Sequence, residues 1–306
     1  MVPHPRGAGR YAPSPSSDLH LGNLRTAVVA WLMARTSGRD FLLRIDDLDV
    51  ERSRVDVAER QLADLAALGL DHDREVMWQS ERADAYTAAL ASLDTYECFC
   101  TRREIADAVR APHQQPDAYP GTCADLTEAE RAERRRERPA ALRVRAHGVQ
   151  HTVTDLWAGE VTGCVDDFVV RRNDGTAAYN LAVVVDDAAV GVDQVIRGAD
   201  LLNSSPRQAW LAEQLGHRAP TYGHAGLAVT ADGRRLAKRD GAVTLADLAE
   251  VGVDTADVLG QVAVSLDLAT PGEAVTAETL RSRFDPAVRP GPWIVGEGAG
   301  PVRGRR

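Results

Sequence analysis

The loop Ala12–Asn23 carries residue types that could hold a nucleotide. It is rich in serine and proline and ends in His20-Leu21-Gly22-Asn23, just before an apolar helix. A helix that follows a parallel strand presents free N–H groups and a positive dipole end, which suits a phosphate. His20 can add a donor, and Gly22 lets a flat base approach the backbone. Turns of this composition are also common without a ligand, so composition alone leaves both interpretations open.

Three cysteines, Cys98, Cys100 and Cys123, lie close together in the sequence and could ligate a metal. The chain has 4 cysteines in 306 residues, which is too few for a disulfide framework. Clustered thiolates of this kind are typical of a structural zinc site. Tetrahedral zinc needs a fourth ligand, and spacing alone favours His113, because imidazole is the commoner partner. Cys164 lies outside the cluster and is expected to be an ordinary small residue.

Two charged segments each allow a functional and a plain interpretation. Arg44-Ile45-Asp46-Asp47-Leu48-Asp49 follows an apolar strand, at the sheet edge where α/β proteins bind ligands, although acidic strand ends are also commonly only solvated. The run 128–138 alternates glutamate and arginine and could face RNA. Oppositely charged residues three and four apart are, however, typical of a solvated helix.

The elements that must position these residues alternate between strand and helix. Strand-like segments at 10–12 and 41–45 flank an apolar helix, and a second helix ends at Gly69, which predicts a βαβ unit with a parallel sheet. Residues from about 98 to 140 show little periodicity and are expected to be an insertion. The α/β pattern resumes afterwards, with strand-like apolar runs at 141–145, 168–171 and 181–185 and a helix at 201–216. Residues after 240 are mainly helical, and a mobile tail is expected from residue 285.

Composition excludes several classes of protein. With 44% hydrophobic and 26% charged residues, the chain is neither collagen-like, of low complexity nor wholly disordered. No apolar run approaches the roughly 20 residues of a membrane span, and the N-terminus lacks the apolar core of a signal peptide, so a cytoplasmic protein is expected. The formal net charge of −9 gives no overall basic footprint for nucleic acid, although it is compatible with a local contact.

Lysine is almost absent from the chain. Lys238 is the only lysine among 36 basic residues, and all the others are arginine. Genomic base composition explains the excess of arginine. A lysine retained at one position suggests a task that a planar guanidinium does not perform, such as following a moving phosphate with a compact point charge.

The nucleotide loop and the Lys238 segment together resemble the two signatures of class I aminoacyl-tRNA synthetases. Pro13-Ser14-Pro15-Ser16 with His20-Leu21-Gly22-Asn23 is similar to the HIGH signature, and Arg10-Tyr11-Ala12 before it resembles the glutamyl/glutaminyl subgroup. Arg235-Leu236-Ala237-Lys238-Arg239 resembles the KMSKS loop, whose second lysine contacts ATP phosphates. The resemblance implies catalytic roles for His20 and Lys238 and binding of ATP, with Mg²⁺, by His20, Gly22, Asn23 and Lys238.

The same resemblance assigns an amino-acid site and a fourth zinc ligand. Asp46 stands where the family has a glutamate that holds the substrate ammonium, one methylene longer. An arginine at the position of Arg197 is carried by the glutamate enzymes of the subgroup, which favours glutamate as substrate. Arg10, Ala12, Ser14 and Tyr179 complete the implied glutamate site. Tyr119-Pro120-Gly121-Thr122-Cys123 is similar to a pattern in which a tyrosine joins three cysteines on zinc, so the resemblance favours Tyr119 over His113.

Chain length separates close relatives within this subgroup. The segment after the Lys238 loop leaves no room for a separate anticodon-binding region, as in the glutamyl-queuosine tRNA(Asp) synthetases. The resemblance to them implies that L-glutamate is activated without tRNA and transferred to queuosine in the anticodon loop of tRNA(Asp), by an enzyme expected to be a monomer. A truncated glutamyl-tRNA synthetase charging tRNA(Glu) and a non-catalytic RNA-binding paralogue remain alternatives. The expected fold is α/β: a class I synthetase Rossmann-type parallel sheet in two halves (1–97 and 141–240), a zinc-containing insertion (98–140) and a short helical region (241–306).

Overall fold

A mostly parallel sheet lies at the centre of the computed structural model, which describes residues 7–101, 103–105, 119–230, 233–234 and 243–295. Its strand order is β3-β2-β1-β9-β10-β6-β7, and only β7 runs antiparallel to its neighbour. The order reverses between β1 and β9, which opens a crevice at the carboxyl ends of these two strands. The strands span β1 Ala8–Tyr11, β2 Asp40–Ile45, β3 Met77–Trp78, β6 Val149–Asp155, β7 Gly159–Val165, β9 Val192–Gly198 and β10 Thr221–Ala225.

Helices cover both faces of this sheet. Successive residues of β2 and β9 belong to different core clusters, because strand side chains alternate between the two faces. Helices α1 and α2 share one cluster with β1 and β2, while α6 and α7 share clusters with the opposite face. The helices span α1 Leu21–Thr36, α2 Val55–Ala67, α3 Ala83–Ala91, α6 Tyr179–Ala189 and α7 Ser205–Gln214, with short 3₁₀ turns η1 Gln79–Glu81 and η2 Ala199–Ser204.

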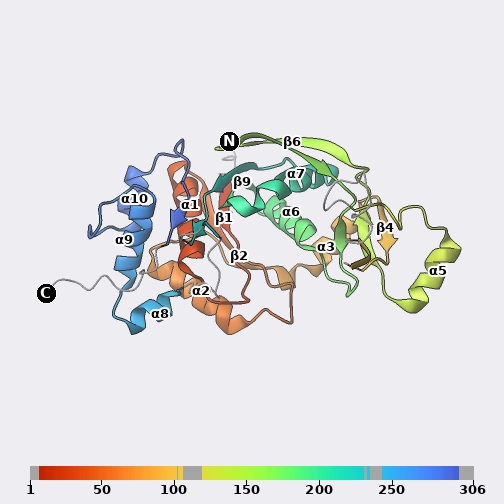
Figure 1. Ribbon diagram of the computed structural model, residues 1–306, viewed down its shortest axis with the longest axis horizontal. Helices are drawn as coiled ribbons and strands as arrows, with labels where there is room; N and C mark the ends of the chain where they lie inside the picture. The colour runs from red at the N-terminus through yellow and green to blue at the C-terminus, as the bar shows by residue number, and fades with distance from the viewer. Residues whose placement is uncertain (1–6, 102, 106–118, 231–232, 235–242, 296–306) are drawn as a thin grey trace, which may run out of the picture.

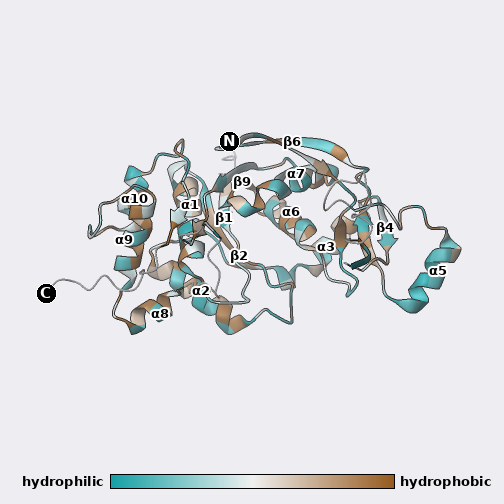
Figure 2. Cartoon of the chain, viewed as in Figure 1, coloured by the Kyte–Doolittle hydropathy of each residue, from teal (hydrophilic) through white to brown (hydrophobic). Residues whose placement is uncertain are grey.

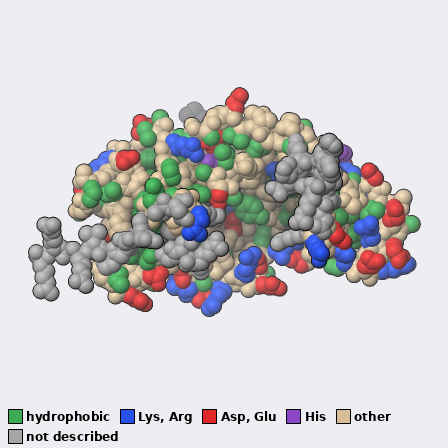
Figure 3. All heavy atoms as spheres, viewed as in Figure 1, with side chains coloured by type: hydrophobic (Ala, Val, Ile, Leu, Met, Phe, Trp, Pro, Cys, Tyr) green, Lys and Arg blue, Asp and Glu red, His purple; other side chains and the backbone are tan. Residues whose placement is uncertain are grey.

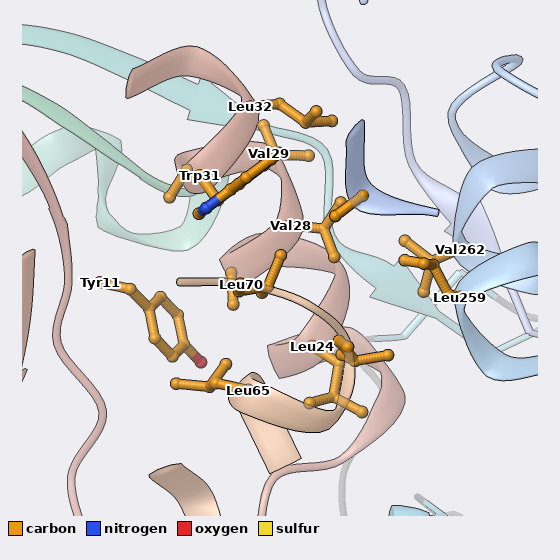
Figure 4. Packing of buried hydrophobic residues seen from close by; sticks show 14 of the residues in the cluster. Tyr11, Leu24, Val28, Val29, Trp31, Leu32, Leu65, Leu70, Leu259 and Val262 are labelled. Carbon is orange, nitrogen blue, oxygen red and sulfur yellow. The ribbon is translucent and has the colours of Figure 1, made fainter. Parts of the chain in front are cut away.

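Helix α1 is buried on all sides because a second layer of helices covers its outer face. The C-terminal helices α8 (Leu245–Glu250), α9 (Thr255–Ser265) and α10 (Ala277–Arg283) form this layer. Leu24 and Val28 of α1 pack in one core with Leu259 and Val262 of α9 (Figure 4). A helix that is apolar all round requires such a double cover.

Arg25 of α1 joins segments that are far apart in sequence. It is only 2% exposed, and its Nη atoms donate to the carbonyls of Gly226 (2.7 Å), Gly291 (2.7 Å) and Ser265 (3.2 Å). Its Nε donates to Ser265 Oγ at 2.9 Å. Since buried polar groups need partners, Arg25 holds the loop after β10, the end of α9 and the C-terminal segment in one place.

The insertion lies at the opposite end of the molecule from the C-terminal helices (Figure 1). Strand β4 (Thr95–Cys98) pairs antiparallel with β5 (Ala141–Val144), which pairs with β8 (Val169–Arg171), so these strands form their own small sheet. Helix α5 (Glu128–Glu137) has no buried residue and is hydrophilic on nearly all sides (Figure 2). Residues 128–138 therefore form the solvated helix that their charge pattern favours.

The structure differs from the sequence-based expectation at three segments. Residues 181–185 lie in helix α6 instead of a strand, since a short apolar run fits a buried helix equally well. Strands β5 and β8 belong to the insertion's sheet and not to the central one. Residues 290–295, predicted to be part of a tail, are hydrogen-bonded to 226–229, where β12 (Trp293–Ile294) pairs in parallel with β11 (Ala228–Val229).

Candidate active site

A pocket of about 700 Å³ opens at the crevice between β1 and β9. This volume is in the usual range for a small-molecule site. Nine residues singled out from the sequence line it: Arg10, Ala12, Ser14, His20, Gly22, Asn23, Asp46, Tyr179 and Arg197. Lys238 and His113 lie outside the described residues. Charged side chains of both signs are interspersed on the face drawn in Figure 3, in keeping with a local and not a face-wide basic contact.

His20 caps helix α1 from its N-terminal end. Its Nδ1 accepts from the backbone N–H of Gly22 (3.0 Å) and Asn23 (3.3 Å), and the Asn23 side chain accepts in return from the His20 N–H. Because Nδ1 is an acceptor, a neutral imidazole carries its proton on Nε2, which makes that atom a donor.

This cap corrects one expectation about the nucleotide loop. The first amides of α1 were expected to be free for a phosphate, yet Leu21 N–H donates to the Val243 carbonyl and the next two amides donate to His20. The structure satisfies them within the chain. What remains for an anion at this helix end is the positive dipole.

Gly22 allows the His20 imidazole and Ala228 to pack closely against the first turn of α1. A Cβ at this position would lie 3.0 Å from both the Ala228 Cβ and the His20 Cε1 and 3.1 Å from His20 Nδ1. Any larger residue would therefore push the imidazole away from the helix or move β11. The glycine is required by the fit of the cap against β11, and not by an unusual backbone angle.

A buried ion-pair network forms the floor of the pocket beside β1 and β2. Arg44 donates from Nε to Asp46 (2.7 Å) and from Nη1 to Asp187, and Arg10 Nε donates to Asp187 at 3.4 Å. Burial pushes the pKa of Asp187 upward, but Arg10 and Arg44 outweigh it and hold the pKa below its ordinary value. Among the described residues nothing pairs with the terminal nitrogens of Arg10, so this fork is open to a ligand.

Asp46 lies beside this network with one oxygen uncommitted. Its Oδ1 accepts from Arg44, and no hydrogen bond to its Oδ2 is made within the described part of the chain. Burial raises the pKa of the Asp46 carboxyl in spite of the neighbouring Arg44. A ligand ammonium next to Oδ2 would favour the charged form.

Arg197, at the end of β9, is buried among neutral partners. Its Nε donates to His224 Nε2 (3.0 Å) and its Nη1 to Gln208 Oε1 (2.7 Å). Its Nη2 donates to the Leu201 carbonyl and to the hydroxyls of Ser204 and Ser205. No carboxylate of the described residues forms an ion pair with this guanidinium, and burial lowers its pKa. These contacts leave one N–H of Nη1 for a ligand, since arginine has five donors.

Four polar residues around the pocket escaped the sequence-based assignment: Arg44, Asp187, Gln208 and His224. Each is at most 7% exposed. Arg44 interrupts an apolar strand and Asp187 an apolar helix, and a charged residue in such a run is a usable signal, because charges are seldom buried without a partner. His224 and Gln208 carry no comparable local signal.

The three cysteines and Tyr119 converge on one point of the insertion. The Sγ atoms of Cys98, Cys100 and Cys123 lie within 4.8 Å of one another. Tyr119 Oη lies 3.4 Å from Cys98 Sγ and 3.7 Å from Cys100 Sγ, and Cys100 lies 3.5 Å from Cys123. Tetrahedral zinc with ordinary Zn–S and Zn–O bonds places its ligands roughly 3.5 to 3.8 Å apart. The set therefore fits a zinc ion without large movement.

The surroundings of this cluster favour the thiolate at Cys98 and disfavour it at Cys100. Burial raises the pKa of Cys98, but the bond with Tyr119 and the charge of Arg143 outweigh it, so the net shift is downward. The Arg143 guanidinium stacks 3.6 Å from the centroid of the Tyr119 ring. Burial raises the pKa of Cys100 to about 12, which a bound cation would reverse.

Comparison with known proteins decides which family has this arrangement. The family model described as tRNA synthetases class I (E and Q), catalytic domain, matches residues 8–263. The chain belongs to this family. It is an aminoacyl-tRNA synthetase-like ligase. Two curated relatives, both named glutamyl-Q tRNA(Asp) synthetase, are 57% identical (Nocardia farcinica, covering 94% of this chain and 93% of the relative) and 53% identical (Cutibacterium acnes, covering 89% and 80%).

Solved structures agree with this assignment to the class I synthetases. A glutamate tRNA ligase from Elizabethkingia meningosepticum, crystallised with its amino acid, matches with a TM-score of 0.78 at 26% identity, over 94% of this chain and 67% of that one. The α/β fold with a mostly parallel sheet is thereby confirmed. Within the described part of this ligase, no helix has both the length and the apolar character needed to cross a membrane.

Proposed function

We propose that this enzyme activates L-glutamate with ATP in the absence of tRNA and transfers the glutamyl group to queuosine in the anticodon loop of tRNA(Asp). The observation that carries the choice of amino acid is the Arg197 guanidinium, buried beside the pocket without a carboxylate partner in the described part of the chain. The names of the two curated relatives support the choice of acceptor.

Charge balance supports glutamate over glutamine. Arg10 and Arg44 are offset by Asp46 and Asp187, whereas the charge of Arg197 has no such offset among the described residues. A substrate with a side-chain carboxylate supplies it, and an amide would leave the buried cation uncompensated. Asp46 is positioned to receive the α-ammonium, with Ala12, Ser14 and Tyr179 lining the same space.

The chemistry needs no nucleophile from the protein. An oxygen of the α-carboxylate attacks the α-phosphorus of ATP, the bond to the β-phosphate bridge breaks, and pyrophosphate leaves. A hydroxyl of the acceptor nucleoside then attacks the activated carbonyl carbon, AMP leaves, and the hydroxyl proton passes to the released phosphate or to water. Mg²⁺ bound with ATP would neutralise part of the charge of its phosphates.

The residues of this chain contribute position and charge. His20 lies in the pocket at the dipole end of α1, Gly22 and Asn23 border the nucleotide, and Lys238 follows the phosphates. Catalysis is then alignment of the reacting atoms plus stabilisation of developing charge.

Exchange and transfer assays test this function. We expect ATP–pyrophosphate exchange that depends on glutamate, needs no tRNA and fails with glutamine. Labelled glutamate should then appear on tRNA(Asp) that carries queuosine and not on matched tRNA(Asp) lacking it. Transfer to the 3′ end of tRNA(Glu) would establish a glutamyl-tRNA synthetase instead, and absence of exchange at all Mg²⁺ concentrations would leave a non-catalytic RNA-binding protein.

We further propose that Cys98, Cys100, Tyr119 and Cys123 hold one structural zinc ion. Bound there, zinc would tie the end of β4 to residues 119–123, where the chain has few other regular elements. Metal analysis of Cys98→Ser should show loss of zinc, while the matched Cys164→Ser protein, altered outside the cluster, should retain it. Equal zinc content in the two variants would refute the site.

A further inference from the structure

Next to the Nε of Arg197 lies a buried pair of residues that the proposed reaction does not use. His224 of β10 is 0% exposed and Asp155, at the end of β6, is 2% exposed. His224 Nδ1 lies 2.6 Å from Asp155 Oδ2, and His224 Nε2 accepts from Arg197 Nε at 3.0 Å. The three side chains form a hydrogen-bonded chain from Asp155 through His224 to Arg197.

The two hydrogen bonds of this chain determine which nitrogen of the His224 imidazole carries the proton. An arginine Nε–H can only donate, so His224 Nε2 must be an unprotonated acceptor. The single proton of the neutral ring is therefore on Nδ1 and is donated to Asp155. A protonated ring would place an N–H against the Arg197 N–H, and both burial and the nearby arginine lower the pKa of His224.

A neutral acceptor at the Arg197 Nε can orient the guanidinium without neutralising its charge. A carboxylate in direct contact with Arg197 would orient it equally well, but it would neutralise the charge that a substrate carboxylate needs. Placing an imidazole between Asp155 and Arg197 keeps the orienting hydrogen bond and moves the negative charge one ring further away. Gln208 and Ser205 also accept hydrogen bonds from Arg197 with uncharged groups, so they too leave its positive charge uncompensated.

We infer that His224 and Asp155 are positioning residues that set the orientation of Arg197 and leave its charge available for the substrate's side-chain carboxylate. This inference rests on the proposed glutamate specificity. It adds two residues that determine specificity without touching the substrate.

Asp155→Asn offers a test that preserves shape. Asp155 Oδ1 accepts the backbone N–H groups of Trp157 (3.0 Å) and Ala158 (2.8 Å), so an asparagine must keep its oxygen there. Its NH₂ group then faces His224 Nδ1 and donates to it. The ring proton is forced onto Nε2, where it meets the Arg197 Nε–H, and Arg197 loses the hydrogen bond that orients its Nε.

His224→Gln is the matched variant, because it changes shape but preserves the hydrogen-bond pattern. The glutamine NH₂ can donate to Asp155 while its oxygen accepts from Arg197. In pyrophosphate exchange we expect Asp155→Asn to raise the KM for glutamate about 30-fold or more, with the KM for ATP unchanged, and His224→Gln to raise it less than about 5-fold. If His224 and Asp155 only filled space, His224→Gln would raise the KM for glutamate more than Asp155→Asn, because asparagine has nearly the same volume as aspartate.

Nitrogen NMR of histidine-labelled protein provides a readout independent of activity. We expect the His224 signal, assigned by its loss in His224→Gln, to show the proton on Nδ1 in the parent protein and on Nε2 in Asp155→Asn. An unchanged tautomer, or a changed tautomer with an unchanged KM for glutamate, would overturn the inference. If the parent protein shows no glutamate-dependent exchange, the proposed function fails, which is distinct from failure of the tautomer test.

Discussion

Gln208→Glu places a carboxylate directly on the cation that is proposed to select glutamate. Gln208 lies on α7, is 3% exposed, and accepts from Arg197 Nη1 at 2.7 Å. The substitution is nearly isosteric. Its other side-chain atom donates to Asn180 Oδ1 at 3.0 Å, and Asn180 can turn its amide to donate to the new carboxylate. The change therefore adds one negative charge with little change in packing.

The structure allows the size of the effect to be worked out. A ligand oxygen bound to the remaining N–H of Arg197 Nη1 shares that nitrogen with residue 208, which places two acceptors roughly 5 Å apart. Two negative charges at about 5 Å with an effective dielectric constant of about 20 repel by about 3 kcal/mol. This corresponds to a rise in the KM for glutamate of about 150-fold. Binding of ATP should not change.

Glutamate-dependent pyrophosphate exchange measures this directly. Gln214→Glu is a suitable control, because it adds the same charge at the exposed end of the same helix. We expect the control to match the parent protein within about twofold. A Gln208→Glu protein that keeps the parent KM for glutamate would show that Arg197 does not bind the substrate carboxylate.

Two further substitutions probe the nucleotide end of the pocket. Gly22→Ala should reduce the exchange rate at least several-fold, because its Cβ would press on His20 and Ala228 at 3.0 Å; an unaltered rate would show that the cap need not be held so closely. Lys238→Arg should strongly depress adenylate formation in single-turnover measurements although it conserves charge, because a guanidinium does not replace a compact ammonium on a moving phosphate. A parent-like rate would identify the lone lysine as an accident of composition.

The sequence predicts the fold class and brings the proposed site residues to one pocket, but it misassigns several elements around the sheet. The residues proposed for ATP and glutamate that fall within the described chain line one pocket, because the motifs place them at strand ends and a helix start, where α/β proteins bind ligands. Their assigned roles stay predictions. The hydrogen bond that His20 Nδ1 accepts from the first turn of its own helix was not foreseen, since histidine is an unusual N-cap and composition gives no sign of it.

Long-range pairing explains most of what the sequence could not show. Local apolar runs at 141–144 and 169–171 correctly indicate strands, but nothing local says that they pair with β4 and not with β1 or β9. Similarly, Asp155 and His224 are 69 positions apart and become neighbours only because β6 and β10 lie side by side. A strand as short as β12 has too few residues to show any periodicity.

The buried clamp of Arg25 has a consequence for how the molecule loses its structure. One guanidinium satisfies carbonyls from positions 226, 265 and 291, and any one of these segments can leave only by depriving a buried N–H donor of its partner. Because the same α1 helix also carries the core shared by the sheet and α9, detachment of the C-terminal helices would expose apolar surface on both sides. The catalytic sheet and these helices should therefore melt together as a single cooperative unit.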